Sequence, residues 1–218
     1  MKKLFLLFAI NAFFISSAST QNLNLILRSN SGIGFSYRTI GGATYSPGGG
    51  SGFEVGANKD LGQGFLPYMV LGYHAAFTFQ ANTGANGNSS AFIDRKYLGF
   101  GAQKLIPFGE NAEKKAKGIL LGFGGLYAFP SKLSERNDGV RAPKITYKPT
   151  LGFTVEVAVN LVANDRLHIN PGIRYRQLKF DSKEVASGDI SSLPSELVNL
   201  DASGLDISLT FIIMGKSQ

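Results

Sequence analysis

The stretch from Leu151 to Leu161, which reads Leu-Gly-Phe-Thr-Val-Glu-Val-Ala-Val-Asn-Leu, decides the fold of this chain. Its odd-numbered positions are all apolar, whereas its even-numbered positions hold Gly, Thr, Glu, Ala and Asn. Successive side chains of a β-strand point to opposite faces, so this alternation separates an apolar face from a polar one. A helix would need apolar residues every three or four positions instead. The stretch therefore predicts a two-faced strand.

Seven further segments repeat this pattern on either side of the first one. In Leu205–Ile213, five apolar side chains oppose Asp206, Ser208 and Thr210. The other segments are Gly32–Arg38, Ser51–Leu61, Tyr68–Ala81, Phe92–Leu105, Gly118–Phe129 and Leu167–Phe180. Clusters of Gly, Asn, Asp, Ser and Pro separate them, as expected of turns between strands. The chain therefore predicts an all-β fold of eight antiparallel strands.

The connections between these segments alternate in length. One set of connections is Gly62–Pro67, Ile106–Lys117 and Ala163–Arg166, and the other set, mostly longer and polar, is Ile40–Gly50, Asn82–Ala91, Pro130–Ile145 and Asp181–Ser203. Transmembrane barrels have an even number of strands, short periplasmic turns and longer external loops. We therefore expect an up-and-down transmembrane β-barrel in a bacterial outer membrane, with both termini in the periplasm.

The N-terminal residues resemble an export signal. Lys2 and Lys3 precede the largely apolar stretch Leu4–Ile15, and Ser16-Ser17-Ala18 supplies the small residues that a signal peptidase recognises. The apolar run is too short to span a bilayer as a helix. We predict a signal peptide over residues 1–18, with Thr20 as a second cleavage position, and a barrel domain over residues 19–218.

The composition excludes several alternatives. The chain has no Cys, which rules out a disulfide scaffold and thiolate metal sites. The mature part has no run of about 18 apolar residues, so it could cross a membrane only as a closed barrel. The net charge is +7, and loss of Lys2 and Lys3 leaves 20 basic and 15 acidic residues, or +5. This modest excess favours acidic partners without identifying one.

The polar face decides whether the apolar face points to lipid or to a ligand cavity. In a soluble barrel the polar face would be the outer surface and would be rich in Lys and Glu, but here it carries mainly Gly, Ala, Ser, Thr and Asn. In Gly118–Phe129, for example, Gly118, Gly122, Gly124 and Ala128 share that face. Five tyrosines fall near predicted strand ends, where membrane barrels carry aromatic girdles: Tyr37, Tyr68, Tyr97, Tyr127 and Tyr175. The membrane barrel is favoured, and a soluble periplasmic ligand-binding barrel is the alternative.

With its signal segment, its strand count and the alternation of Leu151–Leu161 and Leu205–Ile213, the chain resembles the eight-stranded outer-membrane barrels of the OmpA-like and OmpX-like type. It is most similar to the stand-alone, porin-like outer-membrane barrel domains of Bacteroidetes. The resemblance covers nearly all of Gln21–Gln218 and is one of architecture. Two features differ: the chain continues past Phe211 to Gln218 instead of ending on an aromatic residue, and it has no peptidoglycan-binding domain.

The residues that could support catalysis do not form a recognised pattern. The chain has two histidines, His74 and His168. Outer-membrane lipid A deacylases pair a histidine with a serine two residues later, but the corresponding positions here are Ala76 and Asn170. We predict no catalytic residue, no cofactor and no metal site. A lipid A-modifying barrel enzyme is kept as a less favoured alternative.

The predicted polar face also carries ionisable residues, which would point into the lumen, the interior of the barrel. Charged groups there need partners or water, so we expect a charge network. Its candidate members are Glu54, His74, Glu156, Arg174, Arg176 and Asp206. Eight strands leave an interior that side chains can fill. A plugged lumen is therefore favoured over a small porin-like channel for ions or solutes.

The predicted function is that of a non-enzymatic envelope protein with a structural role and external loops for surface interactions. Expected partners are outer-membrane lipid, the barrel assembly machinery and lipopolysaccharide, whose phosphates would suit the basic loop Ser131–Lys148. The identity of a loop ligand is left open. The basic run around Lys114 and Lys115 comes without a nucleic-acid-binding motif, so no nucleic-acid partner is expected.

Overall fold

The computed structural model describes residues 23–40, 43–79, 90–109, 116–137, 140–141, 144–186 and 193–215. The predicted signal peptide and most of the predicted connection Asn82–Ala91 lie outside these ranges. No helix within the described ranges is long and apolar enough to cross a membrane.

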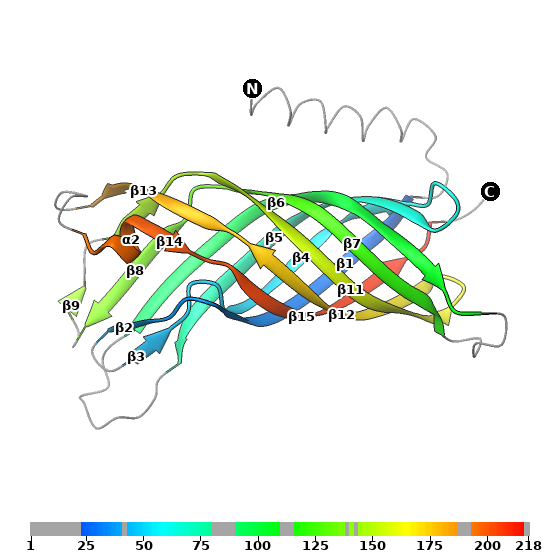
Figure 1. Ribbon diagram of the computed structural model, residues 1–218, viewed down its shortest axis with the longest axis horizontal. Helices are drawn as coiled ribbons and strands as arrows, with labels where there is room; N and C mark the ends of the chain where they lie inside the picture. The colour runs from blue at the N-terminus through cyan, green and yellow to red at the C-terminus, as the bar shows by residue number, and fades with distance from the viewer. Residues whose placement is uncertain are drawn as a thin grey trace.

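Eight long strands of the described chain close into one antiparallel barrel (Figure 1). They are β1 (Leu23–Gly34), β4 (Gly50–Lys59), β5 (Phe65–Phe79), β6 (Ser90–Pro107), β7 (Ala116–Ala128), β11 (Thr150–Asn164), β12 (Leu167–Gln177) and β15 (Gly204–Ile213). Each strand pairs with the next one along the chain, and β15 pairs with β1, with Leu25 opposite Ile213. The predicted fold of eight antiparallel strands in one closed barrel is confirmed.

The two faces that the alternation predicts for each strand form the inner and the outer surface of this barrel. In β15 the polar residues Asp206, Ser208 and Thr210 are buried, whereas Ile207 is 73% exposed. In β11, Thr154 and Glu156 are buried beside exposed Val155 and Val157. Because the polar face is the buried one, the apolar face forms the outer surface.

The first strand differs from its prediction. It spans Leu23–Gly34, whereas Gly32–Arg38 was expected. The alternation is weak here, because Ser29 lies on the outer face and Ile26 on the inner face. The spacing of apolar and aromatic residues after Gly32 imitates a strand, but the chain leaves the barrel wall there, and Phe35 N–H donates to the carbonyl of Ser203.

The longer connections contain regular structure of their own. They hold β2 (Arg38–Ile40), β3 (Ala43–Tyr45), β8 (Lys132–Asn137), β9 (Val140–Arg141), β10 (Ile145–Tyr147), β13 (Lys179–Val185), α2 (Ser195–Val198) and β14 (Asn199–Asp201). β8, β10, β13 and β14 continue the sheet from the start of β6, and β3 pairs with β5. The predicted strand Leu167–Phe180 is therefore divided between β12 and β13. At the opposite end, the turn between β4 and β5 and the turn between β11 and β12 are short.

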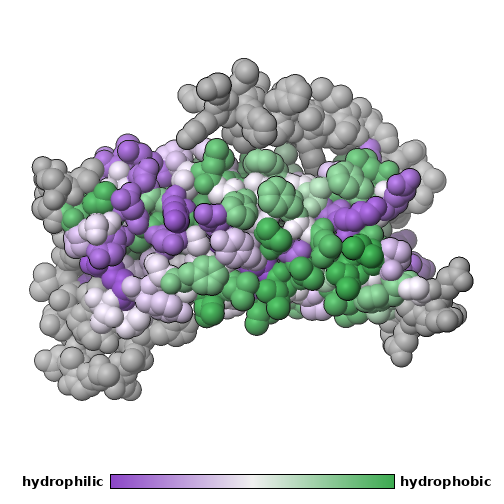
Figure 2. Space-filling view, viewed as in Figure 1, coloured by the Kyte–Doolittle hydropathy of each residue, from purple (hydrophilic) through white to green (hydrophobic). Residues whose placement is uncertain are grey.

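The outer surface is divided into an apolar wall and a polar loop end. Figure 2 shows hydrophobic residues over the wall formed by β7, β11, β12 and β15, and hydrophilic residues over β8, β13 and β14. Large apolar side chains on the wall are well exposed, among them Phe53, Leu71, Phe123, Ile173 and Ile207. Monomeric soluble proteins rarely expose so continuous an apolar surface. The wall is therefore suited to lipid.

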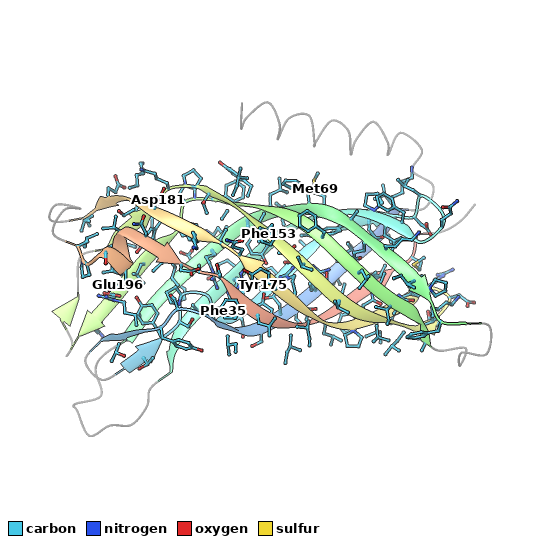
Figure 3. All side chains as sticks on the ribbon, in the orientation of Figure 1. Phe35, Met69, Phe153, Tyr175, Asp181 and Glu196 are labelled. Atoms are coloured by element: carbon cyan, nitrogen blue, oxygen red, sulfur yellow. The ribbon has the colours of Figure 1, made fainter. Side chains whose placement is uncertain are left out.

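Aromatic rings follow one another along part of this wall near the loop end. Figure 3 labels Phe35, Phe153 and Tyr175 of this row. Between ring centroids, Tyr175 lies 5.9 Å from Phe35 and 5.9 Å from Phe153, and Phe153 lies 6.2 Å from Phe123. They belong to β7, β11, β12 and the residue after β1. Such a row is typical of the aromatic girdle of membrane barrels.

Two of the tyrosines expected in that girdle lie inside the barrel, so their predicted position was wrong. Tyr68 is 6% exposed and Tyr97 is 2% exposed. Inner-face glycines make room for them: a Cβ atom on Gly72 would come within 2.3 Å of the Tyr97 ring, and one on Gly124 within 2.3 Å of the Tyr68 hydroxyl. These inner-face glycines are therefore packing sites for interior rings.

Candidate functional site

The candidate site is the lumen, where buried groups of the described residues meet at three levels. At the turn end, Asn24 donates to Asn58 at 2.9 Å, and Asn160 donates to Asn170 at 2.8 Å. Ionisable side chains occupy the middle. At the loop end, folded connections close the barrel.

All six predicted lumen residues lie in the middle of the barrel, and each is at most 3% exposed. They come from five strands: Glu54 (β4), His74 (β5), Glu156 (β11), Arg174 and Arg176 (β12), and Asp206 (β15). Arg28 and Arg95 join them, with exposures of 3% and 1%. These eight residues are called the lumen charge network below.

Arg28 links two carboxylates that would otherwise be separate. Its guanidinium donates to Glu54 at 2.7 Å and to Glu156 at 3.0 Å. Its Nε donates to Thr210 at 2.8 Å. β1, β4, β11 and β15 are thereby connected through one side chain. Removal of Arg28 would leave two buried carboxylates short of a partner, which is strongly unfavourable.

Arg174 and Arg176 connect the remaining carboxylates. Arg174 donates to Glu54 at 2.6 Å, and its Nε lies 3.9 Å from Asp206. Arg176 donates to Asp206 at 2.5 Å. Glu54 also accepts from the Tyr97 hydroxyl at 2.7 Å, so it has three donors. Dense pairing of this kind makes buried charges tolerable in a membrane barrel.

His74 and Arg95 are the members of the lumen charge network that lie nearest the loop end. His74 Nε2 lies 3.8 Å from Asp206, and its Nδ1 contacts the Arg95 guanidinium. Arg95 is held mainly by main-chain oxygens: it donates to Pro47 at 2.5 Å, to Gly49 at 3.1 Å and to Ala202 at 3.3 Å. The network thus ends on backbone carbonyls.

These carbonyls belong to a turn that is folded into the barrel mouth. Residues Ser46–Gly49, called the plug turn below, are all buried. Arg176 donates to Gly48 at 2.7 Å, in addition to the bonds from Arg95. A Cβ atom on Gly48 would meet the Ser203 carbonyl at 1.9 Å, so only glycine allows this approach. The plug turn therefore lies inside the mouth, against Arg95, Arg176 and Ser203.

An apolar core lies beyond the plug turn and covers the mouth. It joins residues of β3, β6, β8, β10, β13, β14 and α2. Its members include Tyr45, Ile93, Leu133, Ile145, Tyr147, Phe180, Leu197 and Leu200, each at most 3% exposed. This set is called the apolar cap below. The predicted loop Ser131–Lys148 contributes two of these strands, β8 and β10, and three of these residues, Leu133, Ile145 and Tyr147.

One polar cluster fixes the apolar cap. Glu135 of β8 accepts from Arg38 at 2.9 Å and from the Tyr45 hydroxyl at 2.5 Å. Burial raises the pKa of Tyr45 well above its ordinary value, and the negative charge of Glu135 raises it further. Burial likewise raises the pKa of Tyr147, with Glu135 as the second cause. Both phenols therefore stay protonated and Tyr45 keeps its hydrogen bond.

Sequence reasoning missed Arg28 and Arg95 for different reasons. Arg28 lies in the strand that was misplaced. Arg95 lies in the predicted segment Phe92–Leu105, whose alternation is obscured by outward Asp94 and Lys96. The sequence did hold a usable signal, because alternation places Arg95 on the same face of that segment as Tyr97 and Gln103. In the structure all three side chains are buried.

The lumen offers little for hydrolytic or metal chemistry. His168 is half-buried at the turn end, where its Nδ1 lies 3.3 Å from Asn160 Nδ2. His74 has Asp206 and Arg95 as neighbours, with Ala76 two residues later on its own strand. Within the part of the chain that the structure describes, no three His, Cys, Asp or Glu side chains are grouped so as to hold a metal ion.

The chain matches no family model and no curated protein. Among solved structures it is similar to the outer membrane protein OprG from Pseudomonas aeruginosa, with 11% identity, coverage of 89% of this chain and 93% of OprG, and a TM-score of 0.50. It is also similar to Neisserial surface protein A (NspA), with 10% identity, coverage of 88% of this chain and 95% of NspA, and a TM-score of 0.44. At 11% identity, the likeness to OprG concerns the fold alone.

Proposed function

We propose that this protein is an integral, non-enzymatic barrel of the bacterial outer membrane whose lumen is sealed and whose folded loops form a rigid external platform. The observation that carries the proposal is the filled lumen: charges in its middle, the plug turn in its mouth and the apolar cap above. OprG, a protein of similar fold, is described as an outer membrane protein. A closer relationship to OmpA-like, OmpX-like or Bacteroidetes-type barrels remains a prediction.

The membrane location is supported by the two surfaces of the barrel. Its outer wall exposes rows of Leu, Ile, Val and Phe, while the residues of the lumen charge network point inward. A closed barrel satisfies every backbone group of the wall without water, which lipid requires. A soluble ligand-binding barrel would have the opposite arrangement, with apolar side chains lining its cavity. The short turns at the end opposite the folded loops support an orientation with both termini in the periplasm.

The filled lumen favours a structural role over a channel. A water-filled pore would need space along the axis, but Arg28, Glu54 and Arg174 meet across the interior at 2.6 to 2.7 Å. Opening a path would separate these pairs in a region of low dielectric constant. A small porin-like channel therefore stands as the second candidate, and it requires a rearranged interior.

The loop end supports a surface-interaction role. Its folded strands β8 and β13 carry exposed basic residues, and a further one follows β10; these are Lys132, Arg136, Lys148, Lys179 and Lys183, with acidic Asp181 and Glu184 beside them. Lipopolysaccharide phosphates would lie at this level of the outer leaflet. Basic side chains bind such groups by charge-assisted hydrogen bonds. Lipopolysaccharide and the assembly machinery are therefore proposed partners.

Membrane extraction combined with heat-modifiable gel mobility tests the proposal. The protein should leave the outer-membrane fraction only with detergent, and an unheated sample should run at a different position from a boiled one because the barrel stays folded. Release by salt alone, or identical mobility of the two samples, would contradict an integral closed barrel. Lipid A mass spectra that change when the protein is expressed would contradict the non-enzymatic role.

A further inference from the structure

A groove lies on the outer surface of the wall, over β6, β7 and β11. Its volume is about 650 Å³, and its lining is almost entirely apolar. Its walls include Phe65, Phe100, Leu121, Phe123, Val155 and Val157. This volume is within the range of small-molecule sites in proteins. The set of lining residues is called the wall groove below.

The depth of the wall groove comes from small residues between large ones. Ala102 lies opposite Phe123, and Gly125 lies opposite Phe100. A Cβ atom on Gly125 would come within 2.7 Å of the Phe100 ring, so that ring rests directly on the backbone of β7. Phe123 is 64% exposed and forms a raised edge. A hydrocarbon chain could therefore lie between the two rings.

One end of the wall groove is basic. Lys104 is exposed and lies opposite Leu121 on β7 and Phe65 on β5. Its Nζ donates to the carbonyl of Gln63 at 2.5 Å, in the short turn between β4 and β5. An ammonium group has three donors, so two remain for another acceptor. The cation therefore stands where the apolar groove reaches the turn end.

We propose that the wall groove binds an acyl chain of an anionic phospholipid from the periplasmic leaflet, with Lys104 on its headgroup phosphate. This rests on the proposed function, because the turn end must face the periplasm. The apolar lining fits a chain, and the single cation at its end fits an anionic headgroup at the membrane surface. Lipopolysaccharide does not fit, because it occupies the opposite leaflet.

The absence of Trp makes the proposal directly testable. Phe123→Trp places a single fluorophore in the wall groove, and Ile207→Trp places one on the wall at β15. Each variant is refolded into phosphatidylcholine vesicles that contain a minor fraction of phosphatidylglycerol brominated in its acyl chains. Bromine quenches only nearby Trp. Folding is verified by heat-modifiable mobility.

We expect brominated phosphatidylglycerol to quench Trp fluorescence more strongly in the wall groove than at β15. One lysine at an anionic surface should enrich the lipid roughly fivefold over its bulk fraction. Adding Lys104→Gln to Phe123→Trp should remove this excess, and Ala102→Leu, which fills the groove, should do the same. Brominated phosphatidylcholine should quench both positions alike.

The contrary outcomes are distinguishable. Equal quenching by brominated phosphatidylglycerol at both positions would overturn the groove proposal and leave the membrane barrel intact. An excess that persists in Lys104→Gln would overturn the role of the cation, and with it the anionic lipid. No quenching at either position would show that the wall is outside the bilayer, which contradicts the proposed function itself.

Discussion

Arg95 donates a hydrogen bond from Nη1 to the carbonyl oxygen of Pro47, 2.5 Å away, and so joins the barrel wall to the plug turn. The same guanidinium reaches Gly49 and Ala202, which belong to two different loop regions. One buried side chain of β6 therefore holds together the elements that close the mouth. Closure of the barrel mouth by the plug turn should therefore depend on Arg95.

Loss of Arg95 should loosen the plug turn. The chain has no Cys, so Ser46→Cys introduces a single thiol at a position that is 6% exposed. This thiol should react slowly with a water-soluble maleimide. Adding Arg95→Met should raise the labelling rate by roughly tenfold or more, because several hydrogen bonds to the turn are lost. Lys96→Met, the exposed neighbour, is the control, and equal labelling rates in the Arg95→Met and Lys96→Met backgrounds would contradict the role of Arg95 in holding the plug turn.

Neutralising Glu54 should destabilise the whole barrel. Glu54→Gln removes the charge that balances Arg28 and Arg174, and breaking a buried pair in this way costs about 3–5 kcal/mol. Urea unfolding followed by gel mobility in detergent measures the change in the free energy of unfolding. The exposed Glu184→Gln should stay within about 0.5 kcal/mol of the parent. Equal effects at Glu54 and Glu184 would mean that the network is not buried as described.

An added methyl group on Gly72 should strain the interior. Gly72→Ala places a Cβ atom within 2.3 Å of the Tyr97 ring, and that ring is held by the hydroxyl bond to Glu54. Overpacking of this kind costs about 1–3 kcal/mol. Gly109→Ala is the control, since a Cβ atom there meets nothing within 4 Å. Unchanged stability of Gly72→Ala would argue against the interior position of Tyr97.

The apolar cap should weaken at alkaline pH. The pKa of Tyr45 is raised in the folded protein, above the value of about 10 for an unfolded tyrosine. At a pH between the unfolded and the folded pKa, the folded protein keeps the Tyr45 proton that the unfolded chain has lost. The contribution of this proton to the free energy of unfolding is therefore complete below pH of about 10 and falls as pH rises. Tyrosinate absorbance measures the titration. Tyr45→Phe should leave the absorbance change around pH 10 unaltered, and a loss of amplitude there would contradict the buried phenol.

The strands could be predicted because the barrel wall imposes a period of two on them. Leu151–Leu161 and Leu205–Ile213 lie within β11 and β15, and their polar positions are the lumen positions. Glu156 and Asp206 could be named from the sequence for this reason. The strand β1 could not, because Arg28 and Ile26 share its inner face and serines interrupt its outer face.

The closure of the mouth could not be predicted, since it depends on contacts between distant segments. Gly48 and Gly49 resemble flexible loop residues in the sequence, and their inward position is set by Arg95, Arg176 and the Ser203 carbonyl. The pairing of β8 with β6 and of β13 with β10 is likewise non-local. Local periodicity holds no information about such contacts.

Conductance across a planar lipid bilayer tests the sealed lumen most directly. Protein that is refolded in detergent, and shown to be folded by its heat-modifiable mobility, is inserted at neutral pH in a salt solution. The account predicts a current that does not differ from that of the bare membrane, because the lumen charge network, the plug turn and the apolar cap fill the interior. Reproducible single-channel steps from the unmodified protein would contradict it.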